Sequence, residues 1–357
     1  MLAVETKAAE LPAPPAGQPA ESEYLWKQVV ESVEPFLDQV SEQLSQQVEH
    51  FDAEVASLAR YVLSNQGKQL RPVLVGLSAE ATGHLSEAHV TAAVIVEMVH
   101  LATLVHDDVM DEAAIRRRRP TAAVHWGNEI SVLLGDCLFA HALKLAASYP
   151  TPEVCRAVAA ATNTVCSGEI LQTLRRRQLE LSHADYFKML EMKTGELFGL
   201  SCELGAFLSG AADDEKNALR RFGLLFGTAY QIYDDCLDLF GAEVAAGKSL
   251  GTDLAHGKLT LPVLIFLERA RPDDRAQLSG WLAKWKTEYL PRVVELVEKY
   301  EVLHASRALV GQRLVAARRH LRFLAPSESR AAFEAMAGFL EQQTLALGVS
   351  STCHTRA

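Results

Sequence analysis

Long segments that are apolar on more than one face dominate the middle of the chain, from residue 87 to residue 240. Short breaks rich in Gly, Pro, Ser and Asp, such as "ASYPTPE" and "LSGAADDE", separate them. No stretch alternates apolar and polar residues as a half-buried strand would. A helix that is apolar on several faces has to be buried, and the centre of a large helical bundle buries it. The sequence therefore predicts an all-α fold with one large domain.

The same periodicity predicts the individual helices. They are expected at about 53–65, 70–82, 87–111, 128–148, 153–180, 184–209, 214–240, 259–271, 287–301, 303–323 and 328–346. Helix is also expected from Tyr24 onward, with Pro35 near a first turn or at a kink. Residues 1–22 are rich in Ala, Pro and Glu and are expected to form a disordered tail. The bundle is then expected to span 23–350, with a flexible C-terminus at 351–357.

Composition narrows the classes of function. The formal net charge is −10, so no nucleic-acid partner is expected, and an anionic ligand needs a local group of basic residues. The six cysteines form no CxxC pair, which favours reduced thiols in a cytoplasmic protein. The N-terminus lacks the cationic start and apolar core of a signal peptide. The apolar stretch from Val90 to Val105 contains Glu97 and His100 and is shorter than a membrane span, so no stable membrane insertion is expected.

Two apolar segments end in aspartates spaced at i, i+1 and i+4. These residues are Asp107, Asp108 and Asp111 in the first motif, and Asp234, Asp235 and Asp238 in the second. Positions i and i+4 of a helix share a face, so each motif presents at least two carboxylates together. Acids at the C-terminal end of a helix are unfavourable there, because the helix dipole is already negative, and they need a compensating cation.

One such motif is weak evidence, because acidic helix ends that face solvent are common. Two copies, each closing an apolar helix, indicate a cleft that binds divalent cations through oxygen atoms. Mg²⁺ binds one or two carboxylates and completes its shell with water and phosphate oxygens. The expected ligand is therefore a diphosphate bridged by Mg²⁺.

Basic residues beside Gly-containing breaks are the expected partners of this diphosphate. They are Lys68, Arg71, Arg116, Arg117, Lys193, Lys248 and Lys258. The remaining arginine runs, Arg118–Arg119 and Arg175–Arg177, are interpreted as solvated charge.

In their order along the chain, several short motifs resemble those of the trans-isoprenyl diphosphate synthases, or polyprenyl synthetases. They run from about Gln66 to beyond Pro262 and include "GKQLRP", "EMVHLATL", "HDDVMDEAAIRR", "WGN", "LLGDCLF", "GEILQ", "KTGELF", "QIYDDCLD" and "GKSLGTDL". Each motif is modest alone, whereas the ordered set is highly specific. The resemblance implies an isoprenoid synthase bundle with a central apolar cavity, a homodimer, and three Mg²⁺ ions per active site, for which Mn²⁺ can substitute.

The resemblance also implies a role for each matching residue. The six aspartates would coordinate the metal ions on the allylic diphosphate. Residues that would contact this diphosphate or the nearby cation are Arg116, Lys193, Thr194, Gln231, Lys248 and Lys258. Residues that would hold isopentenyl diphosphate are Lys68, Arg71, His100 and Arg117. The catalytic set implied is Asp107, Asp108, Asp111, Arg116, Lys193, Asp234 and Asp235.

Three positions depart from the family's usual pattern. Gln66 replaces the first glycine of a Gly-Gly-Lys, Arg118 replaces the glycine after the arginine pair, and Tyr230 replaces a phenylalanine. None of these changes removes an expected ligand, so activity is expected. The loop that carries Arg116 and Arg117 loses conformational freedom and gains charge through Arg118.

The implied reaction joins isopentenyl diphosphate to an allylic diphosphate, head to tail and in trans, by ionisation, condensation and elimination. An apolar interior would keep water from the allylic cation. Product length would depend on the tunnel below Asp107, whose wall would include Val99, Ala102 and Thr103. Family members that make short products tend to have aromatic residues at this level, whereas Ala102 and Thr103 are small. A product longer than C20, in the C30–C50 range, is expected.

Other functions remain open at this stage. A geranylgeranyl or farnesyl diphosphate synthase would make a shorter product at the same kind of site. A class I terpene cyclase needs no isopentenyl site, so the set Lys68, Arg71, His100 and Arg117 argues against it. A regulatory subunit of a heteromeric prenyl synthase generally lacks one aspartate motif. A non-catalytic helical binding module has no use for the ordered basic motifs.

Overall fold

Helix dominates the computed structural model, which describes residues 20–241 and 250–348. The first half contains α1 (Ala20–Glu31), α2 (Glu34–Gln46), α3 (Ala53–Leu63), α4 (Leu70–Thr82), α5 (Glu87–Met110), α6 (Ala122–Ala146) and α7 (Glu153–Leu174). The second half contains α8 (His183–Leu190), α9 (Glu196–Leu208), α10 (Asp213–Phe240), α12 (Thr252–Ala255), α13 (Leu261–Arg269), α14 (Pro272–Ala283), α15 (Leu290–Glu298), α16 (Val302–Leu321) and α17 (Glu328–Ala346). Single turns are the 3₁₀ segments η1 (Gln47–His50) and η3 (Thr287–Tyr289) and the π-helical segment η2 (Glu191–Gly195). The predicted all-α class is confirmed.

Several helices begin at the polar breaks in the sequence. Pro35 lies in the first turn of α2, where its missing N–H costs no helical hydrogen bond. The hydroxyls of Thr121, Ser182 and Ser327 accept backbone N–H groups at the starts of α6, α8 and α17. Such caps satisfy donors that the first helical turn leaves without partners.

Several elements differ from the sequence predictions. The segment expected to be one helix at 184–209 is α8, η2 and α9 in succession, and the helix expected at 153–180 ends at Leu174. Helix α14 was not predicted, because among its residues only Leu278 is buried and so its apolar periodicity is weak. Between α5 and α6, β1 (Ile115–Arg116) pairs antiparallel with β2 (Arg119–Pro120), a ladder too short to show strand alternation in sequence.

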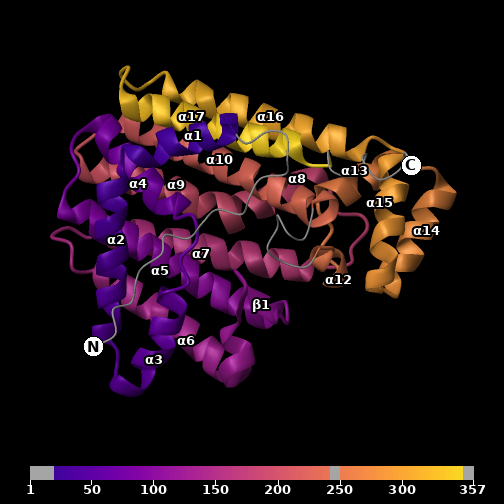
Figure 1. Cartoon of the computed structure of the whole chain (residues 1–357), viewed down its shortest axis with the longest axis horizontal. Coiled ribbons are helices and arrows are strands. Elements are labelled where there is room, and N and C mark those ends of the chain that lie inside the picture. Colours follow the sequence, from indigo (N-terminus) through magenta and orange to yellow (C-terminus); the bar gives the residue numbers. More distant parts are fainter. Residues whose placement is uncertain (1–19, 242–249, 349–357) are drawn as a thin grey trace.

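The helices form layers that place both aspartate motifs in the interior of the bundle. In Figure 1, α16 and α17 run along one edge, α3 and α6 lie at the opposite edge, and α5, α9 and α10 lie between them. The first motif is at the end of α5 and the second is near the end of α10. Large aromatic side chains, among them Phe198, Phe222 and Phe226, are fully buried in the centre.

Helix α5 is the one helix in the described ranges that is long and apolar enough to cross a membrane. Of its apolar window, 72% is buried inside the bundle, as expected for a core helix. By sequence, the apolar stretch from Val90 to Val105 is too short to span a membrane, whereas the helix that contains it runs for 24 residues. Its burial explains its apolar composition without a bilayer.

Close contact between α9 and α10 depends on a glycine. A Cβ atom at Gly223 would lie 2.4 Å from the backbone oxygen of Phe198, and backbone cannot move aside as a side-chain tip can. We predict that Gly223→Ala lowers the free energy of unfolding by about 1–3 kcal/mol through overpacking. Urea denaturation measures this.

The matched control is Gly311→Ala in α16, where an added Cβ meets nothing within 4 Å. There the better helix propensity of alanine raises the free energy of unfolding by about 0.5–1 kcal/mol. Equal effects of the two substitutions would contradict the close-contact explanation.

Candidate active site

Each carboxylate of the first motif faces a basic side chain. The Nζ atom of Lys193 lies 3.7 Å from Oδ2 of Asp107. The Nε atom of Arg116 donates to Oδ1 of Asp108 at 2.6 Å. Although Arg116 favours the ionised form, the burial of Asp108 outweighs it and raises the pKa of this carboxyl group. The cationic compensation expected for acids at a helix end is therefore present.

Asp111 ends the first motif as the C-cap residue of α5 and is shared by two cations. Lys258 donates to its Oδ2 at 2.5 Å and Arg176 donates to its Oδ1 at 3.0 Å. Burial alone would raise the pKa of Asp111, but the charge and hydrogen bond of Lys258 lower it. The interpretation of Arg176 as solvated charge was wrong, since only 22% of its side chain is exposed.

The second motif has different surroundings. Asp235 is buried and accepts hydrogen bonds from the hydroxyl of Tyr186 at 2.5 Å and from Nε2 of Gln231 at 2.9 Å. Burial, reinforced by the nearby charge of Asp253, holds the pKa of Asp235 well above its usual range. The neighbouring Asp234 is half-buried. Neutral donors thus surround Asp235 where cations surround the first motif.

Asp238, the last residue of the second motif, makes structural contacts to the next helix. Its carboxylate accepts from the hydroxyl of Thr252 at 2.9 Å and from the backbone N–H groups of Thr252 and Asp253 at 3.3 and 3.1 Å. These bonds hold the start of α12, and the residue is only 2% exposed. The metal ligand that the sequence spacing predicts here stays a prediction, and the same carboxylate attaches α12 to α10.

Two adjacent residues of η2 connect the motifs. Lys193 reaches Asp107, forms an ion pair with Glu169 and donates to Oε1 of Gln172 at 3.0 Å. The hydroxyl of Thr194 donates to Oε1 of Gln231 at 2.9 Å, and Gln231 in turn donates to Asp235. Single π-helical turns inside α-helices are frequent at functional sites. A polar chain, linked through the backbone between Lys193 and Thr194, thus runs from the end of α5 to α10.

A second cationic group lies deeper, around the residues expected to hold isopentenyl diphosphate. The guanidinium of Arg71 lies 4.5 Å from the ring centroid of Phe198, and its Nε is buried without a partner. Burial lowers the pKa of Arg71 to about 10, although the nearby carboxylate of Glu97 opposes the shift. Glu97 is 2% exposed, so it acts from within the core. Burial and the charge of Arg71 lower the pKa of His100 well below its usual value, so this imidazole is neutral.

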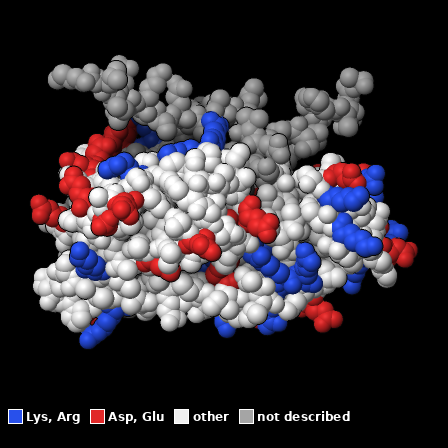
Figure 2. Space-filling model, turned by 90° about the horizontal axis from the view of Figure 1, so that it is seen from below, with Lys and Arg blue, Asp and Glu red and all other residues white. Residues whose placement is uncertain are grey.

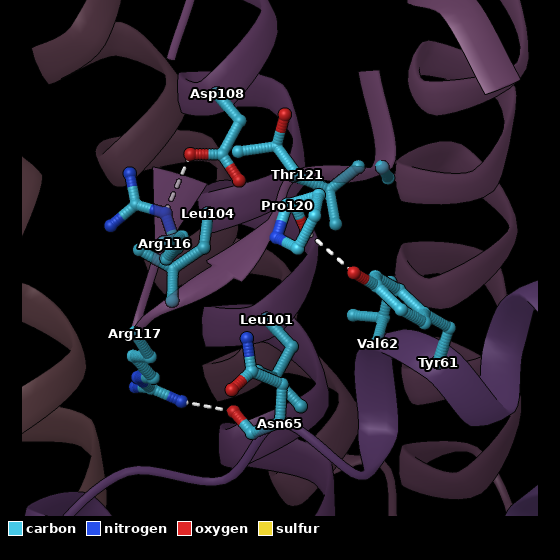
Figure 3. A pocket seen from close by; sticks show the side chains of 12 residues that line it. Tyr61, Val62, Asn65, Leu101, Leu104, Asp108, Arg116, Arg117, Pro120 and Thr121 are labelled. Atoms are coloured by element: carbon cyan, nitrogen blue, oxygen red, sulfur yellow. Dashed lines mark hydrogen bonds and ion pairs between the residues drawn. The ribbon is translucent and has the colours of Figure 1, made fainter. Parts of the chain in front are cut away.

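The β1–β2 hairpin delivers two arginines to this region. Figure 3 shows Arg116 turned toward Asp108, and Arg117 turned toward the backbone oxygen of Asn65, to which it donates. The pocket beside them has an apolar wall from α3 and α5, including Val62 and Leu104. The hairpin thus places one arginine at the first aspartate motif and the other at the loop before α4.

One predicted ligand, Lys68, is not brought into these groups. Lys68 lies on the exposed loop before α4, with its Nζ 5.3 Å from the ring centroid of Phe339 on α17. Lys248 lies outside the described residues. Of the residues expected to line the tunnel, Val99 and Ala102 are buried in α5 and Thr103 is half-buried, with its hydroxyl donating to the backbone oxygen of His100 at 2.6 Å.

Sequence reasoning missed four side chains that contact the predicted residues. They are Glu169, Gln172, Arg176 and Tyr186. The first two lie within and at the end of the quoted "GEILQ" motif at a spacing of i, i+3, which places them on one helix face and was a usable signal. Arg176 and Tyr186 had no such signal, because their contacts depend on loop geometry and on packing between distant helices.

The donor set fits hard divalent cations that arrive with a phosphate ligand. Over residues 20–241 and 250–348, no group of three or more His, Cys, Asp or Glu side chains converges closely enough to hold a metal ion alone. The aspartates supply oxygen ligands, and neighbouring cations currently neutralise those of the first motif. Mg²⁺ typically uses few carboxylates and completes its shell with phosphate oxygens and water.

A family model described as polyprenyl synthetase matches residues 52–299 of the chain, which include both aspartate motifs. The chain belongs to the polyprenyl synthetase family. Among its relatives, the octaprenyl diphosphate synthase of Escherichia coli is 35% identical over 62% of this chain and 68% of its own length. The nonaprenyl diphosphate synthase of Mycobacterium tuberculosis is 41% identical over 60% of this chain and 65% of its own. Component 2 of the heptaprenyl diphosphate synthase of Bacillus subtilis is 33% identical over 85% and 87%.

Solved structures of this family superpose on most of the chain. A polyprenyl synthase from Caulobacter crescentus, crystallised with calcium and isoprenyl diphosphate, has a TM-score of 0.85 and 31% identity, covering 88% of this chain and 97% of its own. A decaprenyl diphosphate synthase from Rhodobacter capsulatus has a TM-score of 0.83 and 30% identity, covering 89% and 99%. The predicted isoprenoid synthase bundle is confirmed.

Two departures from the polyprenyl synthetase pattern have structural consequences. Oε1 of Gln66 accepts from Nε2 of Gln69 at 2.7 Å and from the hydroxyl of Ser41 at 3.1 Å, so this side chain ties the lysine loop to α2. The glycine that remains, Gly67, leaves room for Arg117, since a Cβ there would lie 2.6 Å from Nη2 of that arginine. The second departure, Arg118, lies in a two-residue turn where Arg117 and Arg118 have φ of 50° and 62°.

Positive φ at both central residues favours Asn-Gly in such a turn, and a residue with a Cβ is strained there by about 1–2 kcal/mol. We predict that Arg118→Gly raises the free energy of unfolding by up to about 1 kcal/mol, because glycine's larger entropy in the unfolded chain offsets part of the relief. Arg118→Ala removes the same charge but keeps the Cβ, so it brings no such gain. Urea denaturation of both variants measures the difference, and equal stabilities would rule out the strain.

Proposed function

We propose that this polyprenyl synthetase is a trans-polyprenyl diphosphate synthase that condenses isopentenyl diphosphate with an allylic diphosphate, head to tail. The observation that carries the proposal is the polar chain through Lys193 and Thr194, which joins the aspartates of α5 to those of α10. Two separate cationic groups, one at the first motif and one around Arg71, match a reaction with two diphosphate substrates. Relatives named octaprenyl and nonaprenyl diphosphate synthase support a long product.

The aspartates facing the cleft would hold Mg²⁺ on the allylic diphosphate. The proposed ligands are Asp107, Asp108, Asp111, Asp234 and Asp235, with three ions per site and Mn²⁺ able to substitute. When bound, the ions would supply the positive charge that makes the diphosphate a good leaving group. Arg116, Lys193 and Lys258 now neutralise the carboxylates of the first motif, and they would turn to the diphosphate oxygens once the ions take their place.

Isopentenyl diphosphate would bind at the second cationic group. Arg71 and Arg117 face the single buried carboxylate of Glu97, so this region has more positive than negative charge. The unpaired Nε of Arg71 is a donor ready for a phosphate oxygen. Lys68 would move from Phe339 to the same diphosphate, and His100, which is neutral, would donate a hydrogen bond without adding charge.

The primary experiment measures elongation. Purified protein is incubated with farnesyl diphosphate, isopentenyl diphosphate and Mg²⁺, and product lengths are read by chromatography. We expect products in the C30–C50 range, and loss of elongation on chelation with EDTA or in Asp107→Ala. Elongation only after a partner protein is added would instead indicate a subunit of a heteromeric synthase, the situation suggested by the relative named component 2. Products of C20 or less would favour the geranylgeranyl or farnesyl alternative.

The growing chain would extend past the small residue Ala102 in the core of α5. This side chain is fully buried one helical turn before the first motif, about 6–7.5 Å along the axis. We predict that Ala102→Phe shortens the product to C15–C20, because an aromatic ring would close the tunnel at this level. The readout is the product distribution with farnesyl and geranyl diphosphate as primers.

Ala102→Ser, which adds little volume, serves as the control and should keep the long product. A shortened product from both variants, or from neither, would count against a tunnel at this position.

The proposed enzyme works as a homodimer through the face of α6 and α7. This face exposes large apolar side chains, namely Val124, Ile130, Val132, Leu133, Ile170 and Leu174. Figure 2 looks at the molecule from the side of α3 and α6, and much of the surface there carries neither acidic nor basic side chains. Exposed apolar patches of this kind mark association sites in soluble proteins. A second copy is the occupant that the resemblance to homodimeric synthases favours.

We predict that Leu133→Asp converts the dimer to a monomer, because its side chain is 60% exposed on this face. Val315→Asp on α16 is the matched control, since that side chain is 47% exposed on the opposite edge. Light scattering after size exclusion gives the mass of each variant. A wild type that is monomeric alone would contradict the homodimer.

The cellular setting and domain limits complete the proposal. We place the enzyme in the cytoplasm, because α5 is a core helix rather than a membrane span. The synthase domain is proposed to extend over 23–350. The first residues of α1 lie slightly before this limit, since that helix begins at Ala20.

A further inference from the structure

The three consecutive arginines after α7 are not equivalent. Arg175 and Arg177 are exposed, whereas Arg176 turns inward and its side chain is 22% exposed. The guanidinium of Arg175 donates only to the nearby side chain of Gln178, at 3.1 Å. That of Arg176 reaches Asp111, 65 positions earlier in the chain, at 3.0 Å. One arginine of the run therefore enters the first aspartate motif.

The backbone holds Arg176 in this position. The N–H of Arg177 donates to the backbone oxygen of Gly257 at 2.7 Å, which joins the arginine loop to the loop that carries Lys258. Arg177 has a φ of 62° and Gly257 a φ of 70°, so both loops turn through left-handed conformations at this junction. Arg176 and Lys258 are thereby placed on the two oxygens of the same carboxylate.

The single carboxylate of Asp111 leaves part of the charge and of the hydrogen-bond donors of Arg176 and Lys258 unused. Asp111 has a single negative charge for two positive side chains, and the Nε of Arg176 is buried without a partner. A buried donor with no acceptor is costly and marks a place where a ligand can supply one. The planar fork of an arginine matches two phosphate oxygens, which a lysine cannot do.

We propose that Arg176 is a further binding residue for the diphosphate of the allylic substrate. The inference rests on the proposed function, in which divalent cations take the oxygens of Asp111. Arg176 then exchanges Asp111 for phosphate oxygens and engages its unpaired Nε–H as well. Because Arg176 and Lys258 are held together by the Arg177–Gly257 hydrogen bond, they approach the diphosphate from the same side.

The test compares three substitutions that lower the net charge equally: Arg175→Gln, Arg176→Gln and Arg177→Gln. The probe is inorganic pyrophosphate with Mg²⁺, and its dissociation constant is measured by calorimetry on the full-length protein. We expect Arg176→Gln to weaken binding about tenfold, the effect of losing one charge-assisted contact of roughly 1.4 kcal/mol. Arg175→Gln and Arg177→Gln should change it less than about twofold.

Kinetics separate a binding role from a structural one. In Arg176→Gln, the KM for the allylic diphosphate should rise about tenfold while the KM for isopentenyl diphosphate stays unchanged. Arg176→Lys keeps the charge, and we expect it to recover part of the affinity but not the two-point contact. Melting temperatures show whether each variant folds, and if Arg176→Gln does not fold, the comparison of Arg176→Lys with wild type decides the question.

The outcomes distinguish this inference from the function on which it rests. Pyrophosphate binding by Arg176→Gln that equals that of Arg175→Gln would overturn the inference and leave the synthase proposal intact. The same holds for equal binding by wild type and Arg176→Lys if Arg176→Gln is unfolded. A wild type that binds pyrophosphate through Arg176 but elongates no substrate would support the inference and refute the synthase proposal.

Discussion

The negative end of α5 is the constraint on which the site depends. Three carboxylates lie where the helix dipole is already negative, so they are stable only beside cations. The chain meets this demand with side chains from separate elements, Arg116 from the hairpin, Lys193 from η2 and Lys258 from the loop after α12. The carboxylates at this helix end thereby pair with side chains from three segments that lie far apart in the sequence. Under the proposed function, the same cations would contact the diphosphate once metal ions take their place on the carboxylates.

Two motifs with the same spacing have different chemistry because their surroundings differ. Cationic side chains contact every carboxylate of the first motif, whereas the neutral side chains of Tyr186 and Gln231 donate to the buried Asp235. Asp238 is committed to holding α12. A carboxyl group in a neutral network is more readily protonated than one beside a cation, and a bound cation favours its charged form. The spacing predicts which residues could bind metal, and only their neighbours determine how each one does so.

The departures from the family pattern are accommodated locally. Gln66 adds hydrogen bonds to Ser41 and Gln69, which stiffen the loop that a glycine would leave free. Arg118 occupies a left-handed turn where glycine is usual, so the hairpin carries strain at the point where it presents Arg116 and Arg117. In both places a residue with a side chain stands where the family usually has glycine, and its contacts or its backbone strain are confined to the loop that carries it.

The sequence alone determined most of the helices, the two aspartate motifs and the resemblance to the family. Apolar periodicity places α3, α4, α5 and α10 nearly to the residue, and the spacing of the aspartates follows from helix geometry, because both are local properties. Periodicity could not separate α8, η2 and α9, since a π turn keeps the residues helical. Nor could it distinguish Arg176 from its neighbours or foresee that Asp238 caps α12. Those outcomes depend on contacts such as Arg176–Asp111 and Lys258–Asp111, 65 and 147 positions apart. Only the packed structure decides them, because a side chain's direction there is set by loop dihedral angles and by which charge lies opposite.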